Sequence, residues 1–241
     1  MAVLEKIATD LAGNGLILRG GFGFDREDDA PAGPSGRPAA AVLLVGHAGS
    51  SIWPHFQAWL ARQPAGLADP LDQWSRQVIG RVAQKAGART VSPSDRPYLP
   101  FQQWAMRAEG LRPSPLGVLL HPDYGPWHAY RGALLFDEGA AATDVAALSR
   151  ATGPRDHPCD TCVDKPCLAA CPVKAHKLDR FDYDACRGHL RRPAGVSCMA
   201  GGCIDRLACP VGADFRYLPA QQVFHMRAYA PDGVAHEVAG A

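Results

Sequence analysis

The chain has 241 residues, of which 47% are hydrophobic and 20% charged, and its formal net charge is +1. That length supports one or two domains whose cores need no disulfides. The balanced charge argues against nucleic acid or an anionic membrane as the main partner, because both attract a basic surface.

The ends and apolar runs of the sequence predict a cytoplasmic protein with no membrane partner. The first stretch, MAVLEKIATDLAGNG, contains Glu5 and Asp10 and lacks the apolar run of a signal peptide. The longest apolar stretch, PAAAVLLVG, is far too short to span a bilayer. Cytoplasmic cysteines stay reduced, and clustered ones bind metal more often than they form disulfides.

The first half of the chain is predicted to mix strands and helices. AAAVLLVG, at 39–46, is typical of a buried strand, and HAGSSIWPHFQAWLARQ predicts a turn followed by a helix. The clearest helix spans 69–87, with Asp69 as N-cap, Pro70 at its first position and Gly87 as its stop. PFQQWAMRAEG predicts another helix.

A glycine-rich turn, VGHAGSS at 45–51, joins the predicted strand to the helix that follows. Backbone amides around Gly46, His47 and Gly49 are placed to hold an anionic or amide-rich ligand at a helix start. The turn lacks the lysine of a P-loop and the third glycine of a dinucleotide-binding motif.

LGVLLHPDYGPWHAYRGALLFDEG, at 116–139, predicts two strands around a turn at 122–125. Such a hairpin brings His121, Trp127, Tyr130 and Arg131 close together. By residue type alone this aromatic and basic cluster favours core packing with a salt bridge.

The composition changes once along the chain. All five tryptophans precede residue 130, and all eight cysteines lie between 159 and 209. The stretch ATGPRDHP, at 151–158, contains the glycine and prolines typical of a joint. We therefore predict two domains, an α/β (α+β) domain at 1–150 and a small ferredoxin-like domain at 151–241.

The cysteines are spaced as ligands of iron–sulfur clusters. The order is Cys159-x2-Cys162-x4-Cys167-x3-Cys171-Pro172, then Cys186, then Cys198-x4-Cys203-x5-Cys209-Pro210. In two-cluster ferredoxins the fourth cysteine of one run ligates the other cluster. The same rule predicts one [4Fe–4S] cluster on Cys159, Cys162, Cys167 and Cys209, and a second on Cys171, Cys186, Cys198 and Cys203.

Two other interpretations of the cysteines fit less well. A zinc ribbon needs two tight C-x2-C pairs, and only Cys159 and Cys162 form one. A disulfide framework suits a short secreted chain better. Both runs are looser than the ferredoxin pattern, and His176, His189 and His225 become ligands only if a cysteine does not reach its cluster.

Two segments give a resemblance to a known family. SPLGVLLHPDYGPWHAYRGALL, at 114–135, resembles the corrin-facing hairpin of the cobalamin-processing CblC family and the corresponding hairpin of epoxyqueuosine reductases. The cysteine order and LDRFDYDACRGHL resemble epoxyqueuosine reductases, which hold two [4Fe–4S] clusters beside a cobalamin. Respiratory reductive dehalogenases combine the same two modules.

The resemblance implies a flavin-reductase-like mixed-sheet domain that holds a corrinoid, with a flavin as the alternative. Gly46, His47, Gly49, Trp127, Tyr130 and Arg131 would contact the cofactor, and His121 would approach it. Counting back from the helix in PFQQWAMRAEG places Asp95 where that family has its proton donor. The family's C-terminal helical repeats have no counterpart before residue 241, and the near-neutral charge argues against tRNA as the substrate.

The sequence therefore predicts a cytosolic iron–sulfur redox protein whose two clusters deliver electrons to a corrinoid or a small-molecule substrate. Its electron donor would be a flavodoxin, a ferredoxin or a reductase. The alternative is a ferredoxin-type electron carrier whose first domain docks a partner protein such as a metalloenzyme.

Overall fold

The computed structural model describes residues 2–149 and 156–234, which fall into two compact units. Unit 1 consists of residues 1–111 and 128–155, and unit 2 of residues 112–127 and 156–241. The predicted joint at 151–158 lies largely outside the described residues, so the predicted domain boundary stays a prediction. Each unit is described below by itself.

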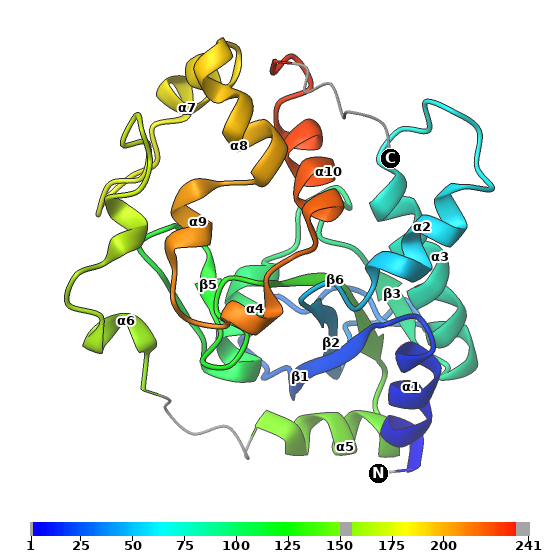
Figure 1. Cartoon of the computed structure of the whole chain (residues 1–241). Helices are drawn as coiled ribbons and strands as arrows, with labels where there is room; N and C mark the ends of the chain where they lie inside the picture. Colours follow the sequence, from blue (N-terminus) through cyan, green and yellow to red (C-terminus); the bar gives the residue numbers. More distant parts are fainter. Residues whose placement is uncertain (1, 150–155, 235–241) are drawn as a thin grey trace. The chain divides into compact units, whose positions relative to one another are not determined.

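Unit 1 is a sheet flanked by helices (Figure 1). Its elements are α1 (Ala2–Ala12), β1 (Ile17–Gly23), β2 (Ala41–Ala48), α2 (Trp53–Leu60), α3 (Pro70–Lys85), β3 (Arg89–Val91), α4 (Phe101–Glu109), β6 (His128–Phe136) and α5 (Ala140–Ser149). The strand order is β1-β2-β6-β3, and each pair is antiparallel. Helices α4 and α5 lie against β1, and α3 lies against β3 and β6.

The core of unit 1 is built around β2. Its residues from Ala41 to His47 are all buried, which confirms the strand predicted from AAAVLLVG. Helix α5 approaches β1 closely because two glycines leave room for it. A Cβ on Gly21 would lie 2.8 Å from Val145 Cγ1, and one on Gly23 would lie 3.0 Å from Ala146 Cβ.

The predicted helices are confirmed, with one difference at a cap. The stripe of Leu71, Trp74, Val78 and Val82 on α3 is buried as its spacing predicts. The side chain of Asp69 makes no capping hydrogen bond, and its backbone lies in the left-handed region with φ 43°. Helix α3 therefore begins at Pro70 without the side-chain cap that the sequence predicts.

The predicted hairpin at 116–139 is wrong. Strand β5 (Leu119–Leu120) pairs with β4 (Arg112–Pro113) in a separate two-stranded sheet of unit 2, whereas β6 pairs with β2 and β3. A tight turn closes instead through backbone hydrogen bonds between His121 and Gly125. The long partners of β6 outweigh a local pairing, because a nine-residue strand buries more surface against β2 than against two residues.

Unit 2 consists of short helices and turns. Besides β4 and β5 it contains α6 (Pro158–Thr161), η1 (Pro166–Leu168), α7 (Tyr183–Leu190), η2 (Pro193–Gly195), α8 (Val196–Gly201), α9 (Ile204–Ala208), η3 (Ala213–Phe215) and α10 (Pro219–Tyr229). A small core joins Leu190, Cys198, Met199 and Ala230, with Met226 of α10 packed against it.

The fold class is confirmed in its coarser part. The chain combines helices with strands, which confirms the predicted α and β content. The predicted mixed sheet is wrong, because the strands of the four-stranded sheet pair in the antiparallel sense. Within 156–234 the only β pairing is an isolated bridge between His176 and Phe181, which gives no support to a ferredoxin-like domain. Across the described residues no helix is both long enough and apolar enough to cross a membrane.

Candidate functional site

The eight cysteines all lie in unit 2, and they gather in two neighbourhoods. We define the first thiol set as Cys159, Cys162, Cys167 and Cys209, and the second thiol set as Cys171, Cys186, Cys198 and Cys203. Every thiol in these sets is free of disulfide bonds. Where burial and charge shift the pKa of a cysteine, the other cysteines that contribute to the shift belong to its own set. Their role as ligands stays a prediction.

The first thiol set is built on α6, η1 and the end of α9. Cys159 lies on α6 beside His157, whose ring accepts a hydrogen bond from the Cys159 backbone N–H at 3.3 Å. The Lys165 ammonium donates to the Cys162 carbonyl at 2.9 Å, which ties the loop between two cysteines. Burial raises the pKa of Cys167 to about 11, and the negative charge of neighbouring Cys209 adds to this effect.

The second thiol set surrounds a cavity, which we call the cysteine cavity. Its volume is about 200 Å³, and all four thiols of the set line it. They come from different elements: Cys171 follows η1, Cys186 lies on α7, Cys198 on α8, and Cys203 directly before α9. Four segments of the chain therefore line one cavity.

A glycine makes the short connection between α8 and α9 possible. Gly202 has φ +93°, and a Cβ there would lie 2.1 Å from Gln222 Oε1. Only glycine adopts this backbone conformation without strain. The turn at Gly202 therefore brings Cys198 and Cys203 to the same cavity.

The remaining wall of the cysteine cavity is mostly apolar, with a few polar groups. Ala175, Phe181, Leu190, Ile204 and Met226 supply apolar surface, and His176, His189, Asp205 and Tyr229 supply polar atoms. Burial raises the pKa of Cys198 to about 11, with neighbouring Cys203 and Cys171 adding to the effect. A hydrogen bond from the Tyr229 hydroxyl to Cys186 acts in the opposite direction on the pKa of Cys186, which burial raises.

A buried charged cluster in unit 1 was missed by the sequence analysis. Arg19 on β1 is only 1% exposed and donates two hydrogen bonds of 2.9 Å to the carboxylate of Glu109. It also donates to His128 Nδ1 at 3.2 Å, and the Tyr130 hydroxyl donates to Glu109. Burial raises the pKa of Tyr130 well above its usual range. The detectable signal was a lone arginine inside the apolar strand LILRGGFG.

Two register shifts lie beside this cluster. One falls between Leu18 and Gly21 of β1, and the other between Val45 and Gly46 of β2. Such bulges turn neighbouring side chains away from the regular alternation. Gly46 is required here, because a Cβ would lie 2.3 Å from the Ala129 carbonyl oxygen.

The predicted cofactor contacts are divided between the units. In unit 1, His47 Nδ1 donates to the Gly49 carbonyl at 2.9 Å, Tyr130 joins the Arg19 cluster, and Arg131 bonds instead to Asp72 and Ser75. In unit 2, His121 Nδ1 accepts from the Asp123 backbone N–H at 3.1 Å. Trp127 is 1% exposed and lies 4.6 Å from the Arg206 guanidinium. Their roles in cofactor binding stay predictions.

Asp95, the predicted proton donor, lies in the loop after β3. Its carboxylate accepts from the Ser92 backbone N–H at 2.7 Å and pairs with Arg76 at 3.3 Å. Its side chain is 39% exposed. The two contacts give Asp95 a structural role at the turn, and its catalytic role stays a prediction.

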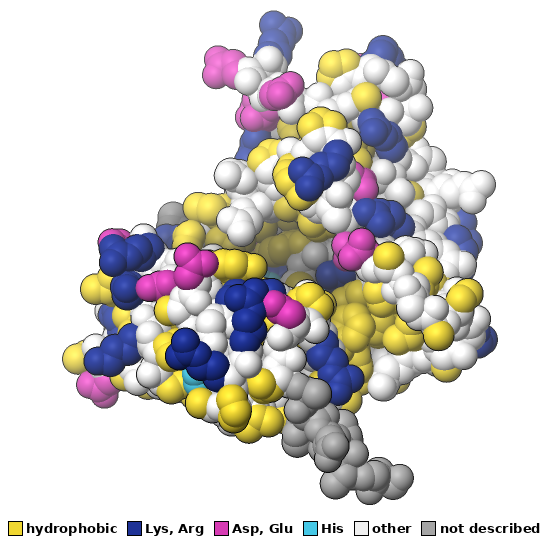
Figure 2. All heavy atoms as spheres, turned by 90° about the horizontal axis from the view of Figure 1, so that it is seen from above, with side chains coloured by type: hydrophobic (Ala, Val, Ile, Leu, Met, Phe, Trp, Pro, Cys, Tyr) yellow, Lys and Arg dark blue, Asp and Glu magenta, His cyan; other side chains and the backbone are white. Residues whose placement is uncertain are grey.

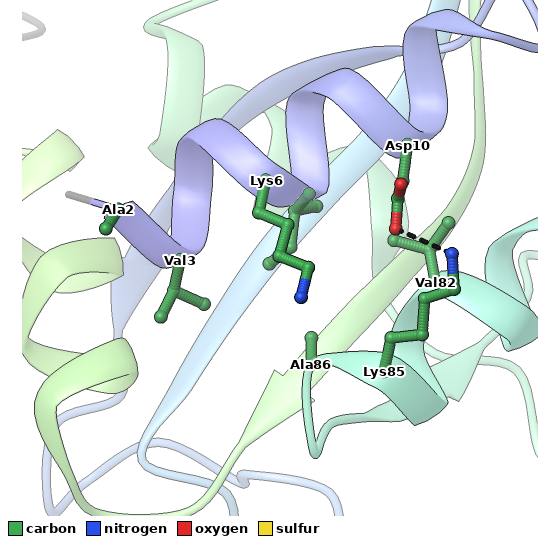
Figure 3. A pocket seen from close by; sticks show the side chains of 8 residues that line it. Ala2, Val3, Lys6, Asp10, Val82, Lys85 and Ala86 are labelled. Atoms are coloured by element: carbon green, nitrogen blue, oxygen red, sulfur yellow. Dashed lines mark hydrogen bonds and ion pairs between the residues drawn. The ribbon is translucent and has the colours of Figure 1, made fainter.

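A second pocket lies between α1 and α3 and contains none of the predicted site residues (Figure 3). Its volume is about 310 Å³, and Ile7 and Val82 contribute apolar surface. Lys85 at its edge pairs with Asp10 at 3.1 Å, and the Lys85 side chain is 61% exposed. The charged groups of this pocket are therefore largely in contact with solvent, unlike those of the cysteine cavity.

Comparisons with known proteins define no family for the chain. No protein-family model matches it, and no curated protein matches it. Its fold is similar to the crystal structure of a C. elegans B12-trafficking protein, CblC, a human MMACHC homologue. The identity is 11% and the TM-score 0.49, with 98% of each chain covered. A likeness this distant assigns neither a ligand nor an activity, and it does not support the resemblance to epoxyqueuosine reductases.

The predicted function, an iron–sulfur redox protein that delivers electrons to a corrinoid, is wrong, and so is its ferredoxin-type alternative. Across residues 2–149 and 156–234, no group of three or more His, Cys, Asp or Glu side chains is arranged to hold a metal ion.

Proposed function

We propose that unit 2 is a receptor for thiophilic inorganic ligands that its cysteine thiolates hold. The observation that carries this proposal is the cysteine cavity, where all four members of the second thiol set line a space of about 200 Å³. The first thiol set would form the corresponding site with Cys159, Cys162, Cys167 and Cys209. An electron-carrying role is no part of this function.

The chemistry of the donors supports a soft ligand. Thiolates prefer soft or borderline metals, and four of them satisfy such a metal centre without harder donors. In the ligand-free chain, burial raises the pKa of Cys198 to about 11, so this thiol stays protonated near neutral pH. Binding would therefore release protons, as ligation by thiols generally does.

The ligand is expected to be larger than one ion. The described side chains form no group that would hold a single metal ion, although four thiols line one cavity. Thiolates arranged around a space, and not around a point, suit a polynuclear core with several metals at its corners. The two [4Fe–4S] clusters predicted from the sequence are one form of such a ligand, and polynuclear cores without sulfide are the other.

The other predicted ligands and partners have less support. Cobalamin or flavin binding by unit 1 stays a prediction that rests on Gly46, His47 and Tyr130, as do a small-molecule substrate and the predicted electron donors. Figure 2 shows basic and acidic side chains interspersed on the face in view. The absence of a nucleic-acid partner stays a prediction.

Anaerobic loading of the full chain tests the proposal. The reduced protein is offered Cd²⁺ alone, or ferrous iron with sulfide, and bound metal, acid-labile sulfide and reactive thiols are measured. We expect metal uptake with protection of both thiol sets. Cys186→Ser should remove about half of the uptake by disabling one set, as should Cys162→Ser. Met226→Leu, in the same cavity but without a thiol, is the matched control.

The two loading conditions distinguish the forms of the ligand. Iron taken up together with an equal amount of sulfide indicates a sulfide-bridged cluster, whereas uptake of more than one cadmium per thiol set indicates a polynuclear thiolate core. If thiols stay fully reactive under both conditions and no metal remains bound after desalting, the proposed function is wrong.

A further inference from the structure

An imidazole and a carboxylate form a hydrogen-bonded pair in the wall of the cysteine cavity. His176 Nδ1 donates to Asp205 Oδ2 at 2.7 Å. The Asp205 side chain is only 1% exposed, and that of His176 is 14% exposed. Both residues line the cavity together with the second thiol set. The His176–Asp205 pair is therefore largely shielded from solvent.

The hydrogen bond determines which ring nitrogen is available. An ionised carboxylate only accepts hydrogen bonds, so His176 carries a proton on Nδ1. In the neutral ring the lone pair then lies on Nε2. Histidines that ligate metals almost always donate their other ring N–H to a carboxylate, a backbone carbonyl or water, which fixes the tautomer and the ring orientation.

The ring of His176 is also held in place by its neighbours. It packs on Phe181 with ring centroids 4.6 Å apart, and a backbone bridge joins the same two residues. The second oxygen of Asp205, Oδ1, is buried and has no hydrogen-bond partner among the described residues. Buried polar atoms are nearly always satisfied, so this orphaned oxygen is consistent with a further polar or cationic group inside the cavity.

We propose that His176 is a nitrogen ligand of the thiophilic core in the cysteine cavity, and that Asp205 is the positioning residue that orients it. This inference rests on the proposed function and adds a mixed sulfur and nitrogen donor set to it. The class of ligand is a polynuclear core of borderline-soft metal ions, because such ions accept both thiolate and imidazole donors.

The other histidines of unit 2 do not share this arrangement. His189 also lines the cavity, but its Nε2 is buried without a hydrogen-bond partner in the described structure, and no carboxylate orients its ring. His225 lies on α10 and is not part of the cavity lining, and its ring packs on Tyr217. His225→Gln is therefore a matched control for a change at His176.

The test uses ¹¹³Cd²⁺ on the full chain with ¹⁵N-labelled histidine. In the wild-type protein we expect a cadmium resonance that is coupled to one histidine nitrogen and shifted from the position of purely thiolate-bound cadmium. His176→Gln should abolish that coupling and move the resonance to the all-sulfur position. Asp205→Asn should weaken the coupling, since an amide orients the ring less firmly, and His225→Gln should leave the spectrum unchanged.

The outcomes separate this inference from the proposed function. Bound cadmium in the wild-type chain with no nitrogen coupling overturns the role of His176 and leaves the thiol receptor standing. No bound cadmium in the wild-type chain, by NMR or by metal analysis, overturns the role of His176, and it overturns the proposed function as well when loading with ferrous iron and sulfide also fails. The decisive spectrum is recorded on the wild-type protein, so a failure of His176→Gln to fold does not remove the test.

Discussion

Each of the two units of this chain has a different kind of core. Unit 1 has a sheet whose strand β2 is buried from Ala41 to His47, with helices packed on it. Unit 2 has a small core around Leu190 and Met199, and buries three of its cysteines. Large apolar side chains such as Val163 and Leu178 stay 90% and 77% exposed there. A unit with so small a core depends on something besides hydrophobic burial for its stability.

The interiors of the two units differ in the kind of side chain that they contain. In unit 1 the apolar side chains occupy the interior, and the buried Arg19 has a carboxylate partner in Glu109. In unit 2 the interior includes a cavity lined by thiols. Under the proposed function, unit 1 is expected to be stable by itself, whereas unit 2 is expected to gain much of its stability from the proposed ligand.

Removing the metal tests most directly whether unit 2 depends on a ligand for its stability. Treating metal-loaded protein with a chelator under reducing conditions should expose the amides of unit 2 to hydrogen exchange, while those of β2 and β6 stay protected. The effect should be the largest considered, on the order of 10 kcal/mol, because folding and metal binding are coupled in small metal-binding modules. Equal protection of unit 2 with and without metal would show that it needs no ligand.

A second experiment tests whether unit 1 depends on its buried charged cluster. Glu109→Ala leaves the guanidinium of Arg19, which is 1% exposed, without its carboxylate partner. Removing one partner of a buried ion pair should lower the free energy of unfolding by about 3–5 kcal/mol. Urea denaturation followed by tryptophan fluorescence measures this loss. The exposed Glu138→Ala should change stability by less than about 0.5 kcal/mol.

A third prediction concerns the pH dependence of the metal-free chain. Burial raises the pKa of Cys167 and of Cys198 from 9.0 to about 11. The unfolded chain therefore loses these protons first, so the stability they contribute is complete below pH 9 and is lost as the pH rises toward 11.

Thermal unfolding of unit 2, recorded under reductant between these pH values, measures that loss. Cys167→Ser removes one of the titrating thiols and should flatten the pH dependence. A melting temperature of the wild-type unit that does not change with pH would contradict the prediction.

The smallest expected effect belongs to the surface of unit 1. Asp10 pairs with Lys85, whose side chain is 61% exposed (Figure 3). An exposed pair contributes about 0–1 kcal/mol, and Asp10 also lies in the last turn of α1, where a negative charge opposes the helix dipole. A double-mutant cycle of Asp10→Ala and Lys85→Ala should give a coupling within this range. A larger coupling energy would mean that this exposed ion pair contributes as much to stability as a buried one.

The sequence predicted local structure well where a regular pattern specifies it. The apolar spacing of Leu71, Trp74 and Val78 places α3, and the apolar run at 39–46 places β2. Cysteine order predicted that Cys167 and Cys209 ligate the same cluster. The charge of Cys209 acts on the pKa of Cys167, and their shared ligand stays a prediction.

Three features could not be obtained in this way, for physical reasons. Strand β6 pairs with β2 and not with its sequence neighbour β5, because pairing depends on surface buried between distant segments. The contact between Arg19 and Glu109 joins residues separated by 90 positions, which no local pattern encodes. The distance between thiol sulfurs depends on the packing of α7, α8 and α9, so spacing alone led to the wrong function.

The chain passes between the two units more than once, and this affects its synthesis. Strand β6 lies between β2 and β3 in the sheet, yet the ribosome makes it after residues 112–127, which belong to unit 2. The first unit therefore cannot close its sheet until part of the second has already emerged. Residues 112–127 can complete their own unit only after the cysteine-bearing segment from residue 156 onward has been synthesised. A gene fragment ending at residue 150 would encode residues 112–127 without the rest of unit 2. Neither fragment of such a split would therefore encode a complete unit 2.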